Sequence, residues 1–185
     1  MTEITSASAR PRAEAFERST RVGRGRQHFL VMGALLLLSI LLAYWRVLGA
    51  EFVYDDVRLV EVNPNVSSLG AALRAFFEPL WAFEDPTGTF QNAYWRPLTV
   101  LTLALGRWIS GMEPWAHHAL SLCLHGLATL VAWRFASRLL SNPTLGFAVA
   151  LVFALHPVHV ESVAWIAAIN DPLYGLFALL ALDAH

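Results

Sequence analysis

The sequence predicts an all-α polytopic membrane protein, a bundle of transmembrane helices with a partly helical first external loop. Of its 185 residues, 56% are hydrophobic and the mean hydropathy is +0.49, values typical of membrane proteins rather than soluble domains. Several uncharged apolar runs approach the roughly 20 residues that a helix needs to cross a bilayer. Arginines gather at the ends of these runs although the net charge is only -1. The lipid bilayer is therefore an expected partner, and no nucleic-acid partner is expected.

The first segment, residues 1–28, is polar and holds six of the 13 basic residues of the chain. It is poor in large apolar residues, so we expect a disordered tail. Because arginines are enriched on the cytosolic side of membrane helices, we expect this tail in the cytosol. A secretory signal peptide also has a basic stretch before an apolar one. The length of the run Phe29–Trp45, and the lack of an A-x-A-like cleavage site after it, favour a retained anchor helix.

Four segments are predicted to cross the membrane within a bundle that covers residues 29–185. They are residues 29–48, 115–133, 139–155 and 163–182. Arg134 and Arg138 follow the second segment and indicate a second cytosolic boundary. Residues 49–114 are therefore expected to form the first external loop, and His156 is expected to emerge on the same side.

The last predicted span has two possible forms. Asp171-Pro172 resembles an N-cap residue followed by proline at the first helical position, but only 14 residues follow Asp171. Either a helix that begins near Val163 crosses with Asp171 inside it, or the chain ends within a helix. Both alternatives lead us to expect the N-terminal part of a longer protein.

The external loop contains an adjacent acidic pair, Asp55 and Asp56, shortly after the first apolar run. Ser67–Phe77 has a helical pattern that Pro79 ends. Pro97–Gly106 is apolar but too short to span, which predicts a helix at the membrane interface. A carboxylate at the mouth of a helix bundle can meet a substrate that is carried in the lipid, so the acidic pair is a candidate catalytic site.

Polar side chains form a stripe on the second predicted span. His118, Ser121, His125 and Thr129 are three or four residues apart, which places them on one face of a helix. Polar groups within a span usually face the bundle interior. They either line a functional site or form hydrogen bonds that hold the helices together.

A second polar group, His156, His159 and Glu161, follows the third span. Two histidines and a carboxylate can bind a metal, but Pro157 interrupts the helix on which an i, i+3 histidine pair would be arranged. We favour a polar rim at the external mouth of the bundle. Arg96 lies beside aromatic residues, where it either binds phosphate or anchors the chain at the membrane surface.

Four motifs in this order resemble the membrane portion of the GT-C glycosyltransferases, in particular the transmembrane-and-tetratricopeptide-repeat O-mannosyltransferases and their bacterial relatives. They are Phe52-x-x-Asp55-Asp56 with Asn63 downstream, Tyr94-Trp95-Arg96-Pro97-Leu98, His118-x-x-Ser121-Leu122-x-Leu124-His125, and His156-Pro157-Val158-His159-Val160-Glu161-Ser162-Val163-Ala164-Trp165. The fourth motif is the most specific, and together the four cover roughly residues 29–182. Two positions differ from the family pattern: Ser121 replaces a common Asn, and Ile169 replaces a common Arg.

The resemblance implies a GT-C-type helix bundle and an inverting glycosyltransferase. Such an enzyme would move mannose or a similar hexose from a polyprenyl-phosphate donor to a Ser or Thr hydroxyl of a protein or peptide acceptor. A hydroxyl is a poor nucleophile and needs a general base, so we expect Asp55 to be the base and Asp56 its partner. The residues expected to line the donor site are Arg96, His118, His125, His156, His159, Glu161 and Asp171.

Other features of this hypothesis stay open on the sequence alone. Asp55 and Asp56 are the candidate ligands if a divalent cation takes part. Because Ile169 stands where the family pattern has an arginine, the chain lacks a cation that would face the lipid phosphate. A bacterial inner membrane is the expected location, or the endoplasmic reticulum membrane in a eukaryote.

The alternative function is that of a non-catalytic polytopic membrane module, a transporter or assembly fragment whose histidine stripe serves packing. We find no tetratricopeptide-type repeat in these 185 residues. Whichever function the complete protein has, we expect this chain to be inactive by itself.

Overall fold

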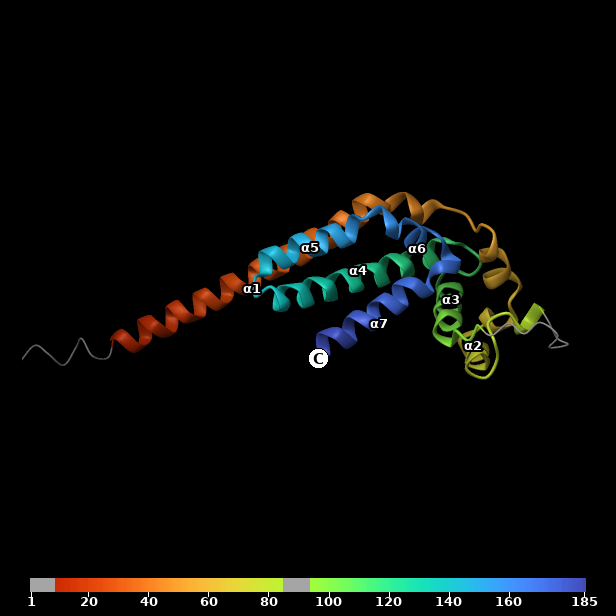
Figure 1. The fold of residues 1–185 in the computed structure, drawn as a ribbon, viewed down its shortest axis with the longest axis horizontal. Coiled ribbons are helices and arrows are strands. Elements are labelled where there is room, and N and C mark those ends of the chain that lie inside the picture. Colours follow the sequence, from red (N-terminus) through yellow and green to blue (C-terminus); the bar gives the residue numbers. More distant parts are fainter. Residues whose placement is uncertain (1–8, 85–93) are drawn as a thin grey trace, which may run out of the picture.

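The computed structural model describes the backbone of residues 9–84 and 94–185, with side chains from residue 27 onward. The described ranges contain helices, turns and loops but no strand. Four long helices form an elongated bundle (Figure 1): α1 (Ala9–Tyr44), α4 (Trp115–Leu139), α5 (Pro143–Leu155) and α7 (Asn170–Ala184). The bundle carries a group of shorter helices at one end (Figure 1).

Three of these segments are long and apolar enough to cross a membrane, namely Gln27–Gly49, Trp115–Leu139 and Ile166–Ala184. A fourth crossing would consist of Pro143–Leu155 together with Pro157–Ala164, which meet at a bend of 47°. The predicted all-α membrane bundle is thus confirmed; the limits of its spans stay a prediction.

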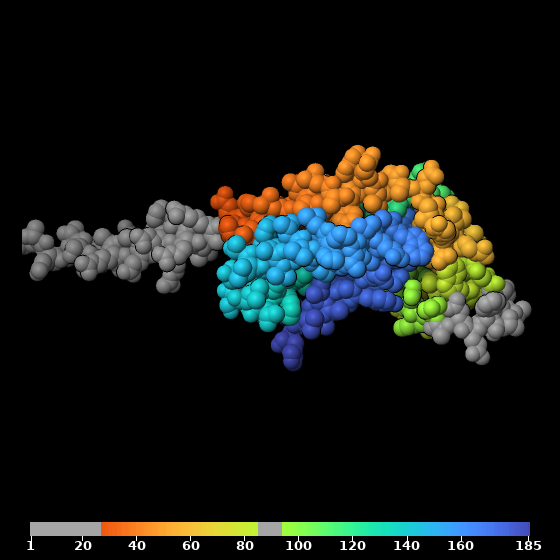
Figure 2. Space-filling model, turned by 45° about the horizontal axis from the view of Figure 1, so that its top comes forward, coloured from red at the N-terminus to blue at the C-terminus, as the bar shows by residue number. Residues whose placement is uncertain are grey.

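The outer surface of the bundle is apolar, as expected for helices that face lipid. The space-filling view shows α1 and α5 side by side along the bundle, with α7 beside them (Figure 2). Large apolar side chains are exposed on all three helices, among them Leu30, Leu41, Leu42, Leu145, Val152 and Phe177.

The N-terminal segment differs from the disordered tail predicted for residues 1–28. Helix α1 begins at Ala9 and includes the rest of that segment, whereas residues 1–8 lie outside the described part. Alanine, arginine and glutamate, which recur in residues 9–18, are strong helix formers. Pro11 lies in the first turn, where proline is tolerated. Local helix propensity therefore extends the membrane helix into a polar sequence.

The segment between α1 and α4 consists of short helices, in agreement with the partly helical loop that was predicted. They are η1 (Trp45–Gly49), η2 (Val57–Val62), η3 (Pro64–Val66), α2 (Leu69–Ala72), η4 (Leu73–Phe76), η5 (Ala82–Glu84) and α3 (Pro97–Ser110). Ser68 caps α2 by accepting a hydrogen bond from the Ala71 N–H at 3.1 Å. Pro97 opens α3 at a position where its missing N–H has no helical partner to lose.

These short helices pack into a core of their own rather than forming an extended loop. The core contains residues from η2, η3, α2, α3 and η7 (Ile166–Ala168), among them Leu59, Val60, Val66, Val100, Leu103 and Ile166. Two smaller clusters join α1 to α4 and α5. The loop segment is therefore fixed to the chain near residue 166, and this contact places it over one end of the bundle.

Helix α4 lies against both α5 and α7 and makes close contact with each. Asn142 caps α5 by accepting from the Thr144 N–H at 3.0 Å and the Leu145 N–H at 3.1 Å. A side chain at Gly146 would meet the Ser137 backbone nitrogen at 2.7 Å, so glycine permits the close approach of α5 to α4.

The start of α7 differs from the prediction that Asp171 is its N-cap. The helix begins at Asn170, and Ile169 is the residue that precedes it without a side-chain cap. Asp171 lies in the first turn, and its carboxylate accepts from the side chains of Ser162 and Asn170 rather than from the helix backbone. The competing side-chain donors explain why the Asp-Pro pattern does not act as a cap here.

An ion pair joins α4 and α7 at the other end of the bundle. The carboxylate of Asp183 is 6% exposed and lies 2.9 Å from Arg134 Nε and 3.0 Å from Arg138 Nη1. Arg138 also donates to the Asp183 backbone carbonyl at 2.5 Å. One buried carboxylate thus holds two arginines of the neighbouring helix.

Replacing Asp183 with alanine should lower the stability of the bundle. The two arginines are more than half exposed and can regain water, so we expect a loss of about 1 to 2 kcal/mol. Thermal unfolding in detergent measures this loss, with Glu61→Ala as a control because Glu61 is an exposed acid. Equal melting temperatures for the two variants would contradict the role of this ion pair.

Candidate functional site

Asp56 connects the first loop to the segment before α7. Its side chain is fully buried; one carboxylate oxygen accepts from the Val53 N–H at 3.1 Å and the other from the Ala167 N–H at 2.7 Å. Ala167 is 111 residues further along the chain. A hydrogen bond to a charged group is stronger than one between neutral groups. Asp56 is therefore a structural link between two distant segments.

The turn before Asp56 has a strained backbone. Tyr54 has a φ of 50°, in the left-handed region that non-glycine residues rarely adopt. Reciprocal bonds close the turn, since Asp56 N–H donates to the Val53 carbonyl at 3.0 Å and the Asp56 side chain accepts from Val53. Burial raises the pKa of Asp56, while the N–H groups of Val53 and Ala167 oppose this rise.

Asp55 differs from Asp56 in that it is exposed to solvent. The nearby Arg58 binds Glu84 of η5, and this contact raises the pKa of Arg58. The adjacent carboxylates therefore have separate environments, one buried and bonded to backbone, the other accessible to a substrate.

Arg96 contacts α7 through a polar chain. Its Nη1 donates to Asn170 Oδ1 at 3.2 Å, Asn170 Nδ2 donates to Asp171 Oδ1 at 2.6 Å, and Ser162 Oγ donates to Asp171 Oδ2 at 3.2 Å. Arg96 is half-buried and lies 4.9 Å from the centre of the Tyr94 ring. These contacts hold Arg96 in place, unlike a freely moving anchor at the membrane surface.

A pocket of about 360 Å³ begins at this polar chain. Its polar part is formed by His125, His159, Ser162 and Asp171. Its apolar part follows α7 and the facing helices, with Phe153, Ala128, Pro172, Gly175, Ala178, Leu179 and Leu182. A polar end joined to an apolar channel fits an amphipathic molecule, one with a charged head and a hydrocarbon tail.

The histidines of α4 have different roles. His125 Nε2 lies 3.0 Å from the Ala154 carbonyl of α5, and its ring is 5.3 Å from that of His159. His117 Nε2 lies 3.1 Å from the Leu103 carbonyl of α3. Both contacts join helices, but only His125 belongs to the predicted polar stripe, and His125 also lines the pocket.

His118 and Ser121 are buried beside these contacts. The Ser121 hydroxyl has no hydrogen-bond partner among the described residues, whereas the His118 ring lies close to the backbone of Ala50. Neither residue lines the pocket described above. The structure therefore brings His125, but not His118, to that pocket.

The other predicted rim residues are more exposed. His156 uses its Nδ1 to accept from the Val158 N–H at 3.2 Å and so caps the turn Pro157–His159. Glu161 is exposed on α6 (Val160–Ala164). In the part of the chain that the structure describes, no group of three or more His, Cys, Asp or Glu side chains could hold a metal.

Two features of the site were not evident from the sequence. Asn170 is 6% exposed and forms a bridge between Arg96 and Asp171. The only sequence signal for this role is that a polar residue stands in an apolar stretch. Ile169 is fully buried in the core that holds the loop segment, so its side chain does not line the pocket beside Asp171.

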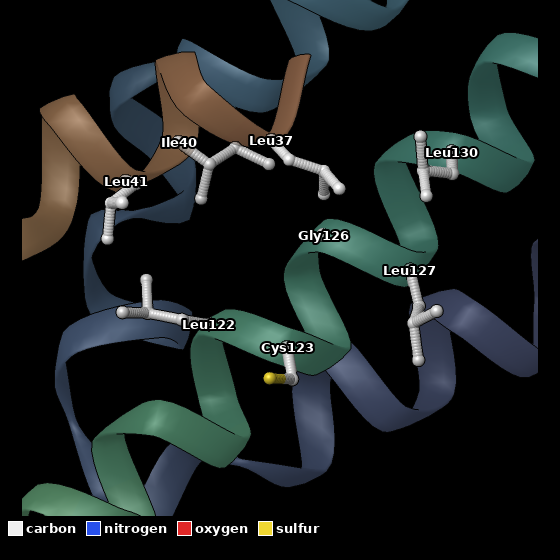
Figure 3. A pocket seen from close by; sticks show the side chains of 8 residues that line it. All are labelled: Leu37, Ile40, Leu41, Leu122, Cys123, Gly126, Leu127 and Leu130. Carbon is white, nitrogen blue, oxygen red and sulfur yellow. The ribbon is translucent and has the colours of Figure 1, made fainter. Parts of the chain in front are cut away.

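A second groove, between α1 and α4, is chemically different. It measures about 400 Å³ and is lined by Leu37, Ile40, Leu41, Leu122, Cys123, Gly126, Leu127 and Leu130 (Figure 3). Figure 3 shows these side chains on the facing surfaces of the two helices. Apart from the Cys123 thiol the lining is hydrocarbon, so this groove offers no group for acid–base chemistry or phosphate binding.

Comparison with known proteins identifies relatives. The chain is 41% identical over 155 residues to protein O-mannosyl-transferase TMTC1 of Homo sapiens, which is 82% of this chain and 17% of the relative. It is 33% identical over 139 residues to TMTC2 of Mus musculus, 75% of this chain and 16% of that protein. It is 36% identical over 129 residues to Tmtc2 of Drosophila melanogaster, 69% of this chain and 14% of that protein.

The chain thus spans about a sixth of the length of these curated relatives. No family model matches it, and no solved structure does. The similarity to the TMTC proteins nevertheless extends over most of this chain. In its membrane portion, therefore, this chain belongs to the transmembrane-and-tetratricopeptide-repeat protein O-mannosyltransferase (TMTC) family.

Proposed function

We propose that the chain forms the catalytic end of a membrane glycosyltransferase that moves mannose or a similar hexose from a polyprenyl-phosphate donor to a Ser or Thr hydroxyl of a protein. The proposal is supported by two hydrogen bonds, from Ala167 to Asp56 and from Arg96 to Asn170, which join the acidic loop to the chain beside the pocket that Asp171 lines. An accessible carboxylate, an arginine and a channel for a hydrocarbon tail then belong to one end of one bundle.

In this proposal Asp55 is the general base. It accepts the proton of the acceptor hydroxyl as that oxygen attacks the anomeric carbon of the sugar. The bond between this carbon and the phosphate oxygen breaks, so the configuration at the carbon inverts and polyprenyl phosphate leaves. Asp55 suits the role because it is exposed, whereas both oxygens of Asp56 already accept backbone N–H groups.

The donor would occupy the pocket along α7. Its polyprenyl chain would lie against Gly175, Ala178 and Leu179, and its phosphate would face the polar end. Arg96 would stabilise the negative charge that grows on the leaving phosphate. His159 and His125, which line the polar end of the pocket, would lie beside the phosphate.

The adjacent acids were the candidate ligands for a divalent cation. Asp56 is fully buried and fixed by two backbone bonds, so it does not form an open carboxylate pair with Asp55. The pair therefore does not fit a metal site.

We further propose that the N-terminus faces the cytosol and that the catalytic end faces outward. Arg134 and Arg138 lie at the opposite end of α4 from His117 and His118, which agrees with the positive-inside rule. The membrane would be a bacterial inner membrane, or that of the endoplasmic reticulum in a eukaryote.

Replacing Asp55 with asparagine should abolish transfer without unfolding the protein. General-base catalysis contributes typically 10²- to 10⁴-fold, so we expect a fall in kcat of about that size and an unchanged melting temperature. Transfer from a polyprenyl-phosphate sugar to an acceptor peptide, in membranes that carry the complete gene product, measures it. Glu51→Gln is the control, since Glu51 is also an exposed acid of this loop.

Asp56→Asn should behave differently from Asp55→Asn. The amide nitrogen cannot accept the bond from Val53 or Ala167, so one backbone N–H loses its partner at a cost of about 1 to 3 kcal/mol. We expect lower activity together with a lower melting temperature.

Normal transfer by the Asp55 variant would refute its role as base, and absence of transfer by the unmodified protein would favour the non-catalytic alternative.

Filling the pocket should weaken donor use. Gly175 lines the pocket, and a Cβ atom there would meet nothing within 4 Å, so the larger side chain of Gly175→Leu can begin without a backbone clash and occupy pocket space. We expect the KM for the donor to rise about tenfold, which corresponds to about 1.4 kcal/mol, with little change in the KM for the acceptor. Gly49→Leu is the matched control because Gly49 also has open space but is not part of the pocket. Equal donor KM values in the two variants would exclude this pocket as the donor site.

A further inference from the structure

Asn170 forms a neutral bridge between an arginine and a carboxylate. Its Oδ1 accepts from Arg96 at 3.2 Å, and its Nδ2 donates to Asp171 at 2.6 Å. Arginine offers only donors and an ionised carboxylate only acceptors. The two partners therefore fix the orientation of the amide, and among residues of this size only asparagine can satisfy both while adding no charge.

The bridge keeps the charge of Arg96 available. Arg96 forms no salt bridge with any residue in the described ranges, although it is half-buried. Direct contact with Asp171 would pair the two charges, whereas the amide separates them. A guanidinium has five N–H groups, so Arg96 retains donors for a second ligand while Asn170 holds one of them.

The position of this arginine indicates an anionic ligand. Asp171 forms part of the pocket wall, and Asn170 connects it directly to Arg96. An arginine whose charge is not neutralised binds phosphate well, because its planar N–H groups match phosphate oxygens. The neighbouring Ile169 is apolar and fully buried in the core, so it offers no charge to such a ligand.

We propose that Asn170 is a positioning residue that holds Arg96 at the polar end of the pocket, where Arg96 supplies the cation for the phosphate of the donor. This proposal rests on the proposed function, since it names the group that meets the donor phosphate. Asn170 itself does not contact the donor; it acts through Arg96.

The decisive variant is Asn170→Asp. A carboxylate at this position would accept from Arg96 and neutralise it, and would also repel Asp171. We expect the apparent Kd for polyprenyl phosphate, measured by a thermal-shift or fluorescence titration in detergent, to rise at least tenfold. In a transfer assay, the donor KM should rise more than the acceptor KM. Asn170→Ala, which removes the bridge without adding charge, should give a smaller rise and serves if the aspartate variant does not fold.

A matched control separates positioning from general stability. Asn65 is also a buried asparagine, and its Nδ2 donates to the Glu78 carboxylate at 3.2 Å, but unlike Asn170 it bonds neither Arg96 nor Asp171. Asn65→Ala should lower the melting temperature without changing the Kd for polyprenyl phosphate. An equal change of Kd in Asn65→Ala and Asn170→Ala would overturn the proposal.

A double-mutant test connects the two residues. If Asn170 acts only through Arg96, then Asn170→Ala, which adds no charge, should add little to the loss of binding caused by Arg96→Gln. Fully additive losses would overturn the positioning role.

The two proposals can fail separately. Unchanged polyprenyl-phosphate binding in Asn170→Asp refutes the inference, even where the unmodified protein transfers sugar. Absence of transfer with intact, Asn170-dependent binding refutes the proposed reaction but supports the phosphate site.

Discussion

The carboxylate of Asp56 is the contact on which the site depends. It accepts from Val53 beside it and from Ala167, 111 residues away, and so ties the first loop to the segment that leads into α7. The bond from Ala167 is buried and the bond from Val53 is partly buried, and an unsatisfied buried N–H or carboxylate oxygen costs about 1 to 3 kcal/mol. The raised pKa of Asp56 shows the opposing cost of burying its charge. The core around Leu59 and Ile166 excludes water from this contact, and in return the contact fixes where Asp55 lies.

The charged contacts of the bundle lie at its two ends. Asp183 pairs with Arg134 and Arg138 at one end of α4, while the asparagine and aspartate of the polar chain lie at the opposite end of α7. Between the ends, His125 satisfies a ring nitrogen on the Ala154 carbonyl, which suits a buried polar group in a helix that faces apolar neighbours. The pocket follows the same division, polar at Asp171 and apolar towards Leu182. A ligand that enters it from the bilayer would meet hydrocarbon before charge.

Hydropathy was sufficient to predict the class of fold, because the length and apolarity of a membrane-crossing helix are set by the bilayer. Local rules were less reliable. The Asp171-Pro172 pattern predicts a cap, yet Asp171 binds side chains instead, and the polar residues after Ala9 continue α1. No pattern distinguishes Asp55 from Asp56, since adjacent residues in a turn point apart and only the distant Ala167 determines which is buried. Asn170 was missed for the same reason: its partner Arg96 is 74 residues away.

The apolar residue at position 169 follows from the packing of this end of the bundle. Its side chain is enclosed by the core that holds the loop segment, and an arginine placed there without a partner would bury an unpaired charge at a cost of several kcal/mol. Arg96 avoids that cost, because it enters from the start of α3, stays half-exposed and stacks on Tyr94. The next residue, Asn170, then bonds this arginine without neutralising it. The two neighbouring residues therefore have complementary roles. Ile169 packs in the core, and Asn170 holds Arg96, whose charge would serve the pocket.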